Sequence, residues 1–358
     1  MRSAAVDIII LTWNQKQVLV DCVESFFTHT KVPCRLIIID NASSDGTREY
    51  LAALKGTDII DLKFLLNSEN IGFVKGMNQG ISISDAPFVC LANNDLVFTK
   101  GWLEEIISVF ESNKNIGVLN PSSNNLGVRP GSDVEIDAFS SALQQKFKGV
   151  FGEMPFCIGF CMVIRREVIK KIGGFSEEFS PFFYEDTDYS LKVLKAGYLI
   201  GVAKGAYVLH KEHVSVNKLG RKKEEYFSKS REAFQKKWGR ILRILFVATD
   251  EAAIDSILLP AIDLARNGNY VWIAVKGLRV SSSEIFRQRK FPEHSGVRFF
   301  SYGNIFHLVW KVIIKKKRYM VVIAKSRSLR SIFSLLGFNV LDRYDGEKIR
   351  ALKYAVLK

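Results

Sequence analysis

The chain has 358 residues, of which 47% are hydrophobic and 25% charged, and this ordinary composition excludes a largely disordered protein. A single hydrophobic core rarely serves more than about 250–300 residues, so we expect two domains. Charge is uneven: residues 1–210 contain 20 Lys and Arg against 24 Asp and Glu, whereas residues 211–358 contain 31 against 13. The basic second half either favours contact with anionic lipid or nucleic acid, or is a solvated basic surface.

The first apolar run, residues 6–13, predicts a buried strand. It contains Asp7 and is followed at once by Asn14, so it is too short for a membrane span and lacks a signal-peptide cleavage site. No later apolar stretch approaches roughly 18 residues, which predicts no transmembrane helix. The five cysteines show no paired spacing, and we expect reduced thiols in a cytoplasmic protein.

The first third of the chain alternates between short apolar runs and helical spacing. The expected strands are residues 7–11, 35–39, 64–66 and 88–91, and the expected helices are residues 17–29 and 74–84. This alternation predicts parallel βαβ units. Polar clusters follow three of the strands, at residues 12–14, 40–45 and 93–95. Loops at the carboxyl ends of parallel strands build the ligand sites of open α/β sheets, so the clusters predict a site.

The rest of the chain divides into a middle region and a second α/β pattern. Residues 121–156 are rich in Ser, Asn, Gly and Pro and lack periodicity, which predicts loops over the site. A helix is expected at residues 186–196, and a basic helical connector at residues 215–240. From residue 241 the alternation restarts with about five parallel strands. We therefore expect an α/β domain over residues 1–240 and a smaller parallel unit over residues 241–358.

Three polar features in the first domain are candidates for chemistry, and each also has a structural explanation. Asp95 closes an Asn-Asn-Asp triplet, where a carboxylate either holds a divalent cation or belongs to an ordinary turn. Glu185 and Asp186 open a helix, where acids either serve as a general base or are favoured by the helix dipole. His210 follows an apolar run, where an imidazole either binds metal or is structural.

Taken together, the segments form an ordered series over about 215 residues. The series consists of residues 9–14, 38–47, 67–73, 76–80, 91–95, 173–179, 184–188 and 210–215. It resembles the family 2 glycosyltransferases, the inverting enzymes of the GT-A fold, and among them the rhamnosyltransferase-like branch. The implied fold is therefore a GT-A nucleotide-diphospho-sugar transferase domain followed by a Rossmann-like unit.

The resemblance implies a nucleoside-diphosphate sugar as donor, linked to UDP, dTDP or GDP. The positions implied in its binding are Thr12, Asn14, Asp40, Asn41, Asn70, Gly72, Asn78, Asn93 and Asn94. Among them Thr12, Asn14 and Asp40 are implied at the nucleotide base. Glycine at position 72 permits close backbone approach.

The resemblance also implies a metal site and a base. Asp95 and His210 are implied as ligands of Mg²⁺ or Mn²⁺, with His213 as second choice for the histidine. Asn93 stands where the family's D-x-D element has its first Asp, which removes one formal charge. Asp186 is implied as the base that deprotonates an acceptor hydroxyl, with inversion at the anomeric carbon, and Glu185 is the second choice. The implied acceptor is a polysaccharide or a lipid-linked oligosaccharide.

The second unit resembles, mostly in topology, the N-terminal half of a GT-B glycosyltransferase. The chain contains no second half of that kind, so we expect this unit to be non-catalytic. Its expected helix at residues 305–316 mixes apolar residues with Lys, and either lies on an anionic membrane or packs on its own sheet. We accordingly expect a cytoplasmic glycosyltransferase of cell wall or polysaccharide biosynthesis, peripheral at the inner face of the membrane.

The residues also argue against two other function classes. A nucleotidyltransferase acting on sugar phosphates would need a glycine-rich phosphate loop, and none appears near Thr12. A nucleic-acid-binding protein would interleave stacking aromatics with its basic residues, and that pattern is missing from the basic half. We therefore expect no nucleic acid partner.

Overall fold

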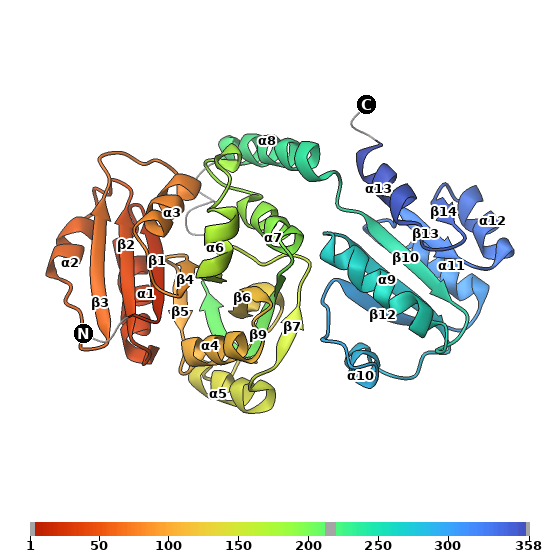
Figure 1. Cartoon of the computed structure of the whole chain (residues 1–358), viewed down its shortest axis with the longest axis horizontal. Coiled ribbons are helices and arrows are strands. Elements are labelled where there is room, and N and C mark those ends of the chain that lie inside the picture. Colours follow the sequence, from red (N-terminus) through yellow and green to blue (C-terminus); the bar gives the residue numbers. More distant parts are fainter. Residues whose placement is uncertain (1–3, 212–219, 356–358) are drawn as a thin grey trace. The chain divides into compact units, whose positions relative to one another are not determined.

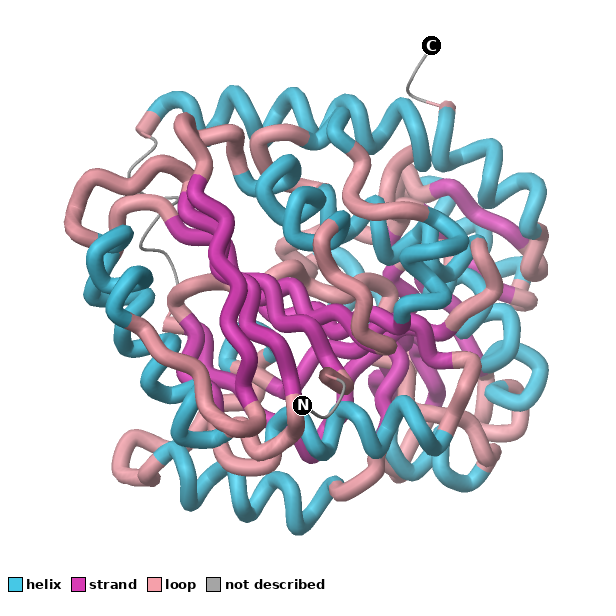
Figure 2. Tube along the Cα trace, turned by 60° about the vertical axis from the view of Figure 1, so that its left-hand side comes forward, coloured by secondary structure: helices cyan, strands magenta, loops and turns pink. Residues whose placement is uncertain are grey.

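The computed structural model describes residues 4–211 and 220–355, which fall into two compact units (Figure 1). The first unit contains residues 1–151 and 156–233, and the second contains residues 152–155 and 234–358. In each unit the strands lie inside and the helices outside (Figure 2). The predicted fold class is confirmed, because a large α/β unit with a parallel-rich sheet precedes a smaller unit with a parallel sheet.

The first unit is built on a mixed sheet. Among the described residues its nine strands run in the order β3-β2-β1-β4-β8-β6-β9-β5, and β7 pairs with β9. The half β3-β2-β1-β4 is wholly parallel, whereas β8 is antiparallel to both of its neighbours. The strands are β1 (Val6–Thr12), β2 (Cys34–Asp40), β3 (Ile60–Leu66), β4 (Phe88–Ala92), β5 (Leu96–Phe98), β6 (Ile116–Ser122), β7 (Phe151–Glu153), β8 (Cys161–Arg165) and β9 (Leu199–His210).

Helices cover both faces of this sheet. They are α1 (Lys16–His29), α2 (Thr47–Ala53), α3 (Phe73–Ser82), α4 (Trp102–Ser112), α5 (Ile136–Phe147), α6 (Arg166–Ile172), α7 (Glu185–Lys195) and α8 (Arg221–Trp238). One core joins α1 and α4 to the strands through Phe26 and Trp102, and the other joins α3 and α7 through Met77 and Tyr189. Strands buried on both faces explain the near-continuous apolar runs of β1 and β2.

Asp7 lies inside β1 and is fully buried; hydrogen bonds reach its Oδ2, whereas its Oδ1 has only the Arg35 guanidinium nearby. Its Oδ2 accepts hydrogen bonds from the backbone N–H groups of Asp85 (2.7 Å) and Ala86 (2.8 Å), just before β4. The guanidinium groups of Arg35 and Arg166 lie 3.7 and 3.6 Å from the same carboxylate. A buried charge with this many partners holds the β1–β4 junction, from which the candidate site is built.

The prediction that residues 121–156 form only loops is wrong, because they contain α5 and β7. Apart from Ser140, the residues of α5 are at least partly exposed, although Ile136, Phe139, Leu143 and Phe147 recur at helical spacing. Two contacts hold it in place: the ring of Phe139 meets Tyr207 edge-on at 5.1 Å, and Ser140 Oγ lies 2.7 Å from Thr99 Oγ1. The Ser, Asn, Gly and Pro content of residues 121–156 as a whole conceals this helical spacing.

The second unit has a five-stranded sheet within the described residues, in the order β12-β11-β10-β13-β14, and all its pairs are parallel as predicted. Helices α9 and α10 pack on one face through Leu258 and Phe286, and α11 and α12 on the other through Leu308 and Phe333. Its elements are β10 (Arg243–Ala248), α9 (Ile254–Arg266), β11 (Tyr270–Lys276), α10 (Ser282–Gln288), β12 (Val297–Tyr302), α11 (Ile305–Ile313), β13 (Val321–Ala324), α12 (Arg327–Leu335), β14 (Asn339–Leu341) and α13 (Gly346–Tyr354).

Two other sequence expectations concern the chain as a whole. The five cysteines are buried and unpaired, as predicted. Over residues 4–211 and 220–355, no helix is long and apolar enough to cross a membrane.

Candidate active site

The polar ends of three parallel strands meet at one edge of the first sheet. Thr12 ends β1 and is in register with Asp40, which ends β2. Asn94, just beyond β4, donates a hydrogen bond from Nδ2 to Thr12 Oγ1 at 3.2 Å. All three side chains are at least nine-tenths buried. The structure therefore brings together the clusters that the sequence placed on separate strands.

Asp40 and Asn14 both form hydrogen bonds with the segment that follows β2. The buried carboxylate of Asp40 accepts from Arg48 Nε at 2.7 Å and from the backbone N–H of Ser43 at 3.2 Å. Asn14 has a positive φ of 46°, donates its backbone N–H to Ser43 Oγ at 2.8 Å, and accepts from the Ser44 N–H at 2.7 Å. These contacts fix the shape of the loop at the β1 and β2 strand ends.

A chain of amide side chains connects β2 with the segment before α3. Asn41 Nδ2 donates to Asn70 Oδ1 at 3.2 Å and to the Gly72 carbonyl at 3.3 Å. Asn41 Oδ1 accepts from Asn67 Nδ2 at 2.8 Å, and Asn67 also bonds Gln79 on α3. The predicted residues Asn41, Asn70 and Gly72 therefore belong to one network.

A close approach to the backbone was predicted at Gly72, and the group that lies there is Pro181 of the same chain. Gly72 has a φ of 84°, and a Cβ placed there would lie 3.0 Å from Cβ of Pro181. The Pro181 carbonyl accepts from the backbone N–H groups of Phe73 (3.1 Å) and Val74 (3.2 Å), the first residues of α3. The N-terminus of α3 is thus capped by the loop that precedes α7.

Asn78 is placed differently from the other predicted binding residues. Its Nδ2 donates to the Phe175 carbonyl, and its Oδ1 accepts from the Phe175 N–H, both at 2.9 Å. This reciprocal pair ties α3 to the segment before α7. These two hydrogen bonds engage Oδ1 and one N–H of the Asn78 amide, and its place at the nucleotide stays a prediction.

Asp95 and His210 form the first of two pairs of titratable side chains. Register in the antiparallel β5–β9 pair sets Leu96 opposite His210, and this brings Asp95 Oδ1 to 3.0 Å from His210 Nε2. The two atoms are close but not aligned for a hydrogen bond, and Asp95 Oδ1 is buried with no hydrogen-bond partner. A buried carboxylate oxygen without a hydrogen-bond donor, 3.0 Å from an imidazole nitrogen, is an arrangement that a cation stabilises.

The imidazole of His210 is held on several sides. The Asn125 amide lies 2.5 Å from Nδ1, the Asn93 amide lies 3.4 Å from Nε2, and the Phe160 ring stacks on the imidazole at 5.6 Å. Asn124 bonds both the N–H and the C=O of His210. The structure sets the amide nitrogen of Asn125 against Nδ1. The reversed amide, with its oxygen accepting from Nδ1–H, would leave the Nε2 lone pair facing Asp95, the tautomer that suits a metal-binding histidine here.

These residues fit a cation shared with substrate and do not fit a cation enclosed by protein alone. Over residues 4–211 and 220–355, no group of three or more His, Cys, Asp or Glu side chains could hold a metal. Mg²⁺ is commonly bound by one or two protein ligands together with substrate phosphates and water. The Asp95–His210 pair matches that donor set. His213, the second-choice ligand, lies outside the described residues.

Glu185 and Asp186, at the start of α7, form the second pair. Asp186 Oδ2 accepts from the Gly159 N–H at 2.9 Å, and Oδ1 accepts from the N–H (2.6 Å) and hydroxyl (3.0 Å) of Thr187. Glu185 Oε2 is buried without a hydrogen-bond partner. Burial, and then the charge of Asp186, raise the pKa of Glu185 to about 8. Burial also raises the pKa of Asp186, and its three hydrogen bonds oppose that rise.

The loop before this pair has a strained backbone. Phe183 and Tyr184 have φ values of 77° and 68°, a region that bulky residues rarely adopt, at a cost of about 1–2 kcal/mol each. Helix α8 packs against them, because the ring of Phe227 lies 5.4 Å from that of Phe183 and 5.6 Å from that of Tyr184. Ser230 Oγ also donates to the Phe182 carbonyl at 3.2 Å. The fold therefore stabilises an unfavourable conformation directly beside two buried carboxylates.

Gly159 and Phe160 bridge the two pairs. Gly159 donates to Asp186, whereas Phe160 stacks on His210 and accepts the Asn93 N–H at 2.9 Å. Adjacent Cα atoms are about 3.8 Å apart, so the pairs lie on either side of one short loop. Sequence reasoning missed Gly159, Phe160, Asn124 and Asn125. None of them lies in a recognisable motif, and their roles depend on contacts between distant segments.

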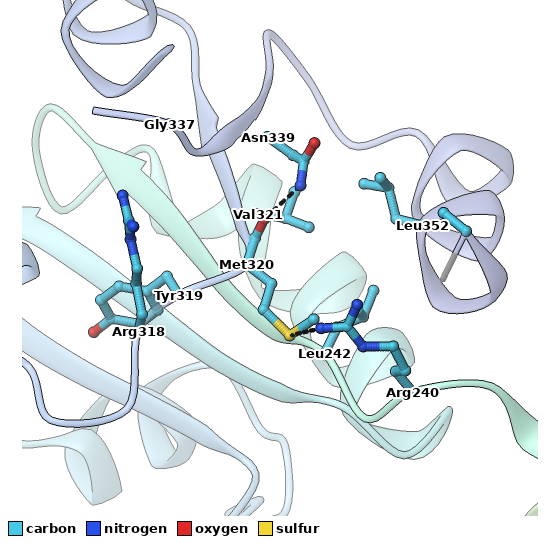
Figure 3. A pocket seen from close by; sticks show the side chains of 10 residues that line it. Arg240, Leu242, Arg318, Tyr319, Met320, Val321, Gly337, Asn339 and Leu352 are labelled. Carbon is cyan, nitrogen blue, oxygen red and sulfur yellow. Dashed lines mark hydrogen bonds between the residues drawn. The ribbon is translucent and has the colours of Figure 1, made fainter. Parts of the chain in front are cut away.

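The second unit contains a pocket whose lining residues differ in kind from the carboxylates and imidazole of the first unit (Figure 3). It has a volume of about 290 Å³, and its lining includes Arg240, Leu242, Met320 and Asn339. Asn339 Nδ2 donates to the Met320 carbonyl at 3.1 Å. No Asp, Glu, His or Cys is among the described residues that line it, so the pocket offers no carboxylate or imidazole for acid–base chemistry.

Part of the chain matches the sequence profile of a known protein family. Residues 7–173 match the sequence profile described as Glycosyl transferase family 2. The O-antigen chain rhamnosyltransferase WbaN of Salmonella anatum is 26% identical over 199 residues, which cover 52% of this chain and 59% of the relative. The N-acetylglucosaminyl-diphospho-decaprenol L-rhamnosyltransferase of Mycobacterium tuberculosis is 24% identical over 213 residues, which cover 51% of this chain and 67% of the relative.

The matches are partial in length. The chain spans about a third to two thirds of the length of the first curated relatives that it matches. Among solved structures, a mannosyltransferase from Pyrobaculum calidifontis, in complex with GDP-Man and Mn²⁺, has a TM-score of 0.47 at 16% identity. That alignment covers 64% of each chain.

Proposed function

We propose that this chain is a member of glycosyl transferase family 2 and that it transfers a sugar from a nucleoside-diphosphate sugar to an acceptor hydroxyl with inversion. One observation carries the proposal. A buried carboxylate pair and an Asp–His pair with ligand geometry lie on either side of the Gly159–Phe160 loop. A proton acceptor and a site for a charged leaving group are the two things that such a transfer needs.

Asp186 is the proposed base. Its raised pKa brings it towards the range in which a carboxylate accepts protons efficiently, and the Gly159 and Thr187 donors hold it in one orientation. The acceptor O–H gives its proton to a carboxylate oxygen of Asp186 while the acceptor oxygen bonds to the anomeric carbon. The bond from that carbon to the diphosphate oxygen breaks, and the diphosphate leaves with the electron pair. Attack opposite the leaving group inverts the anomeric centre.

Glu185 has a different proposed role. With a pKa of about 8 it is mostly protonated at neutral pH and is a poor base there. A neutral Glu185 leaves Asp186 as the single negative charge of the pair, which avoids repulsion between two buried carboxylates. This difference supports Asp186, and not Glu185, as the proposed base.

Asp95 and His210 are the proposed ligands of a Mg²⁺ or Mn²⁺ ion. Such a cation neutralises the charge that develops on the leaving diphosphate. Asp95 contributes the one carboxylate and His210 the one imidazole, and Asn125 and Phe160 orient that imidazole. The donor would lie along the strand ends at Thr12, Asn14, Asp40, Asn41, Asn70, Gly72, Asn93 and Asn94.

The similar proteins narrow the proposed substrates. Two relatives are named rhamnosyltransferases, one for an O-antigen chain and one for a diphospho-decaprenol acceptor. We infer a UDP-, dTDP- or GDP-linked sugar as donor, with a deoxyhexose as the first to test. We also infer a polysaccharide or lipid-linked acceptor at the cytoplasmic face of a membrane.

The test is a donor screen combined with two variants. The full chain is incubated with UDP-, dTDP- and GDP-sugars, Mg²⁺ or Mn²⁺ and a lipid-linked acceptor, and release of the nucleoside diphosphate is measured. Asp186→Asn should lower kcat by about 10²–10⁴ while donor binding is kept, and Glu185→Gln should lower it much less. A larger loss in Glu185→Gln would exchange the two roles. Undiminished transfer by both variants would refute the proposed mechanism.

A further inference from the structure

Helix α11 leaves one apolar side uncovered. Leu308 and Val312 are fully buried against the second sheet, whereas Phe306 is 86% exposed, Trp310 59%, Ile313 56% and Ile314 57%. The spacing of Phe306, Trp310 and Ile313 sets them along one side of the helix. We call these four exposed residues the α11 ridge. Single exposed apolar residues are ordinary, but four large ones on a single short helix form a patch.

The chain segment that contains the ridge is strongly cationic. Residues 294–341 contain nine Lys and Arg and no Asp or Glu. Lys316 and Lys317 follow the ridge directly and are exposed. Helix α12 packs on the same face of the sheet as α11, and it begins beside the exposed Lys325 and Arg327 and ends with Leu335, which is 89% exposed. This whole side of the second unit therefore combines apolar side chains with positive charge.

Nearby lysines show that part of this charge serves the fold instead. Lys311 Nζ donates to the Ser301 carbonyl at 3.0 Å, and Lys315 Nζ lies 3.6 Å above the Trp272 ring. Lys316 and Lys317 are exposed and so remain available to a partner. Their position next to Ile313 and Ile314 places charge at the edge of the apolar ridge.

We propose that the α11 ridge inserts into the interfacial layer of an anionic membrane, with Lys316, Lys317 and the start of α12 contacting lipid phosphates. Aromatic and aliphatic side chains beside Lys and Arg on a helix match the interface between lipid headgroups and acyl chains. A second copy of the chain fits poorly, because a twofold contact would set these cations against each other. A neutral surface would leave them without counter-charges. The proposal is independent of the proposed transfer reaction.

Vesicle flotation of the full chain, without donor or acceptor, tests the proposal. The protein should float with vesicles of phosphatidylcholine mixed with phosphatidylglycerol, and much less with phosphatidylcholine alone, and added salt should weaken binding. Phe306→Ser combined with Trp310→Ser should weaken partitioning at least about tenfold. Lys316→Glu combined with Lys317→Glu should weaken it about fivefold per lysine. All four side chains are exposed, so the variants should keep the fold.

Matched variants on the opposite face of the same sheet serve as controls. Leu259 on α9 is 58% exposed, and the Arg287 side chain on α10 is 80% exposed. Leu259→Ser and Arg287→Glu should bind vesicles like the unchanged protein. Three outcomes would overturn the proposal: no binding to anionic vesicles, an equal loss in ridge and control variants, or a dimer in sedimentation that Phe306→Ser dissociates.

Discussion

The two units share one construction, parallel strands alternating with helices, but their strand ends differ. In the first unit, Thr12, Asp40 and Asn94 are buried and bonded within the site region, and Asp95 carries a buried oxygen with no hydrogen-bond partner. In the second unit, β10 is followed by the exposed Asp250, which accepts hydrogen bonds within its own turn from the Ala253 N–H at 2.9 Å and the Thr249 hydroxyl at 3.1 Å. The same topology is thus compatible with buried polar strand ends and with an exposed one. Whether a strand end can take part in catalysis depends on which side chains it buries.

The largest expected effect compares the two strand-end carboxylates. Asp95→Asn should lower transfer by about a thousandfold or more, since a cation's charge stabilisation amounts to several kcal/mol. Asp250→Asn should leave kcat within about twofold, because exposed substitutions of this kind have small effects. Steady-state kinetics with saturating Mn²⁺ would measure both, with thermal melts to verify folding. A comparable loss in Asp250→Asn would show that the second unit shares the chemistry.

An intermediate effect concerns two asparagines, one in each unit, that contact a histidine. Asn125 lies 2.5 Å from the ring of His210 in the first unit, whereas Asn304 accepts the His307 N–H at 2.9 Å in the second. Asn125→Ala should weaken Mn²⁺ activation about 10–100-fold, the usual result of losing a group that orients a metal ligand. Asn304→Ala should cost about 1 kcal/mol of stability as a lost helix cap, with unchanged metal dependence. Titration of activity with Mn²⁺ distinguishes them, and an unaltered curve for Asn125→Ala would argue against the His210 site.

The smallest expected effect is on the pH dependence of stability, which should have opposite directions for a residue of each unit. The folded pKa of Glu185, about 8, exceeds its unfolded value near 4.3, so unfolding releases a proton between these values and stability falls as pH rises. Burial instead lowers the pKa of His294, in the second unit, to about 3, so stability there falls as pH drops below about 6.5. The slope in each window is at most about 1.4 kcal/mol per pH unit.

Calorimetry of Glu185→Gln and His294→Gln would test these opposite slopes. The Glu185 variant should lose less stability than the unchanged protein between about pH 5 and pH 8, and the His294 variant should lose less between about pH 6 and pH 4. Parallel pH profiles for all three proteins would contradict the assigned shifts.

Sequence reasoning worked best where one residue's environment is set by its own strand. The parallel strands β1 to β4, the strands of the second sheet, the polar strand ends and the acidic start of α7 follow from periodicity and local motifs. It failed for α5, whose helical spacing is concealed by the loop-like composition around it, and for Gly159 and Asn125, whose roles depend on chain segments that fold against them. The bond of the Asn78 amide to Phe175, a residue 97 positions away, has no local signal either, and the role of Asn78 at the nucleotide stays a prediction.

Helix α8 has a consequence for how such proteins can be recombined. It runs without interruption from Arg221 to Trp238, past the boundary between the units at residues 233 and 234. A chimera joined soon after β9 would discard Phe227 and Ser230, and the strained Phe183 and Tyr184 would lose their cover. A junction after residue 233 would keep them. Exchange of the second unit, in evolution or in the laboratory, is therefore compatible with activity only if α8 travels with the first.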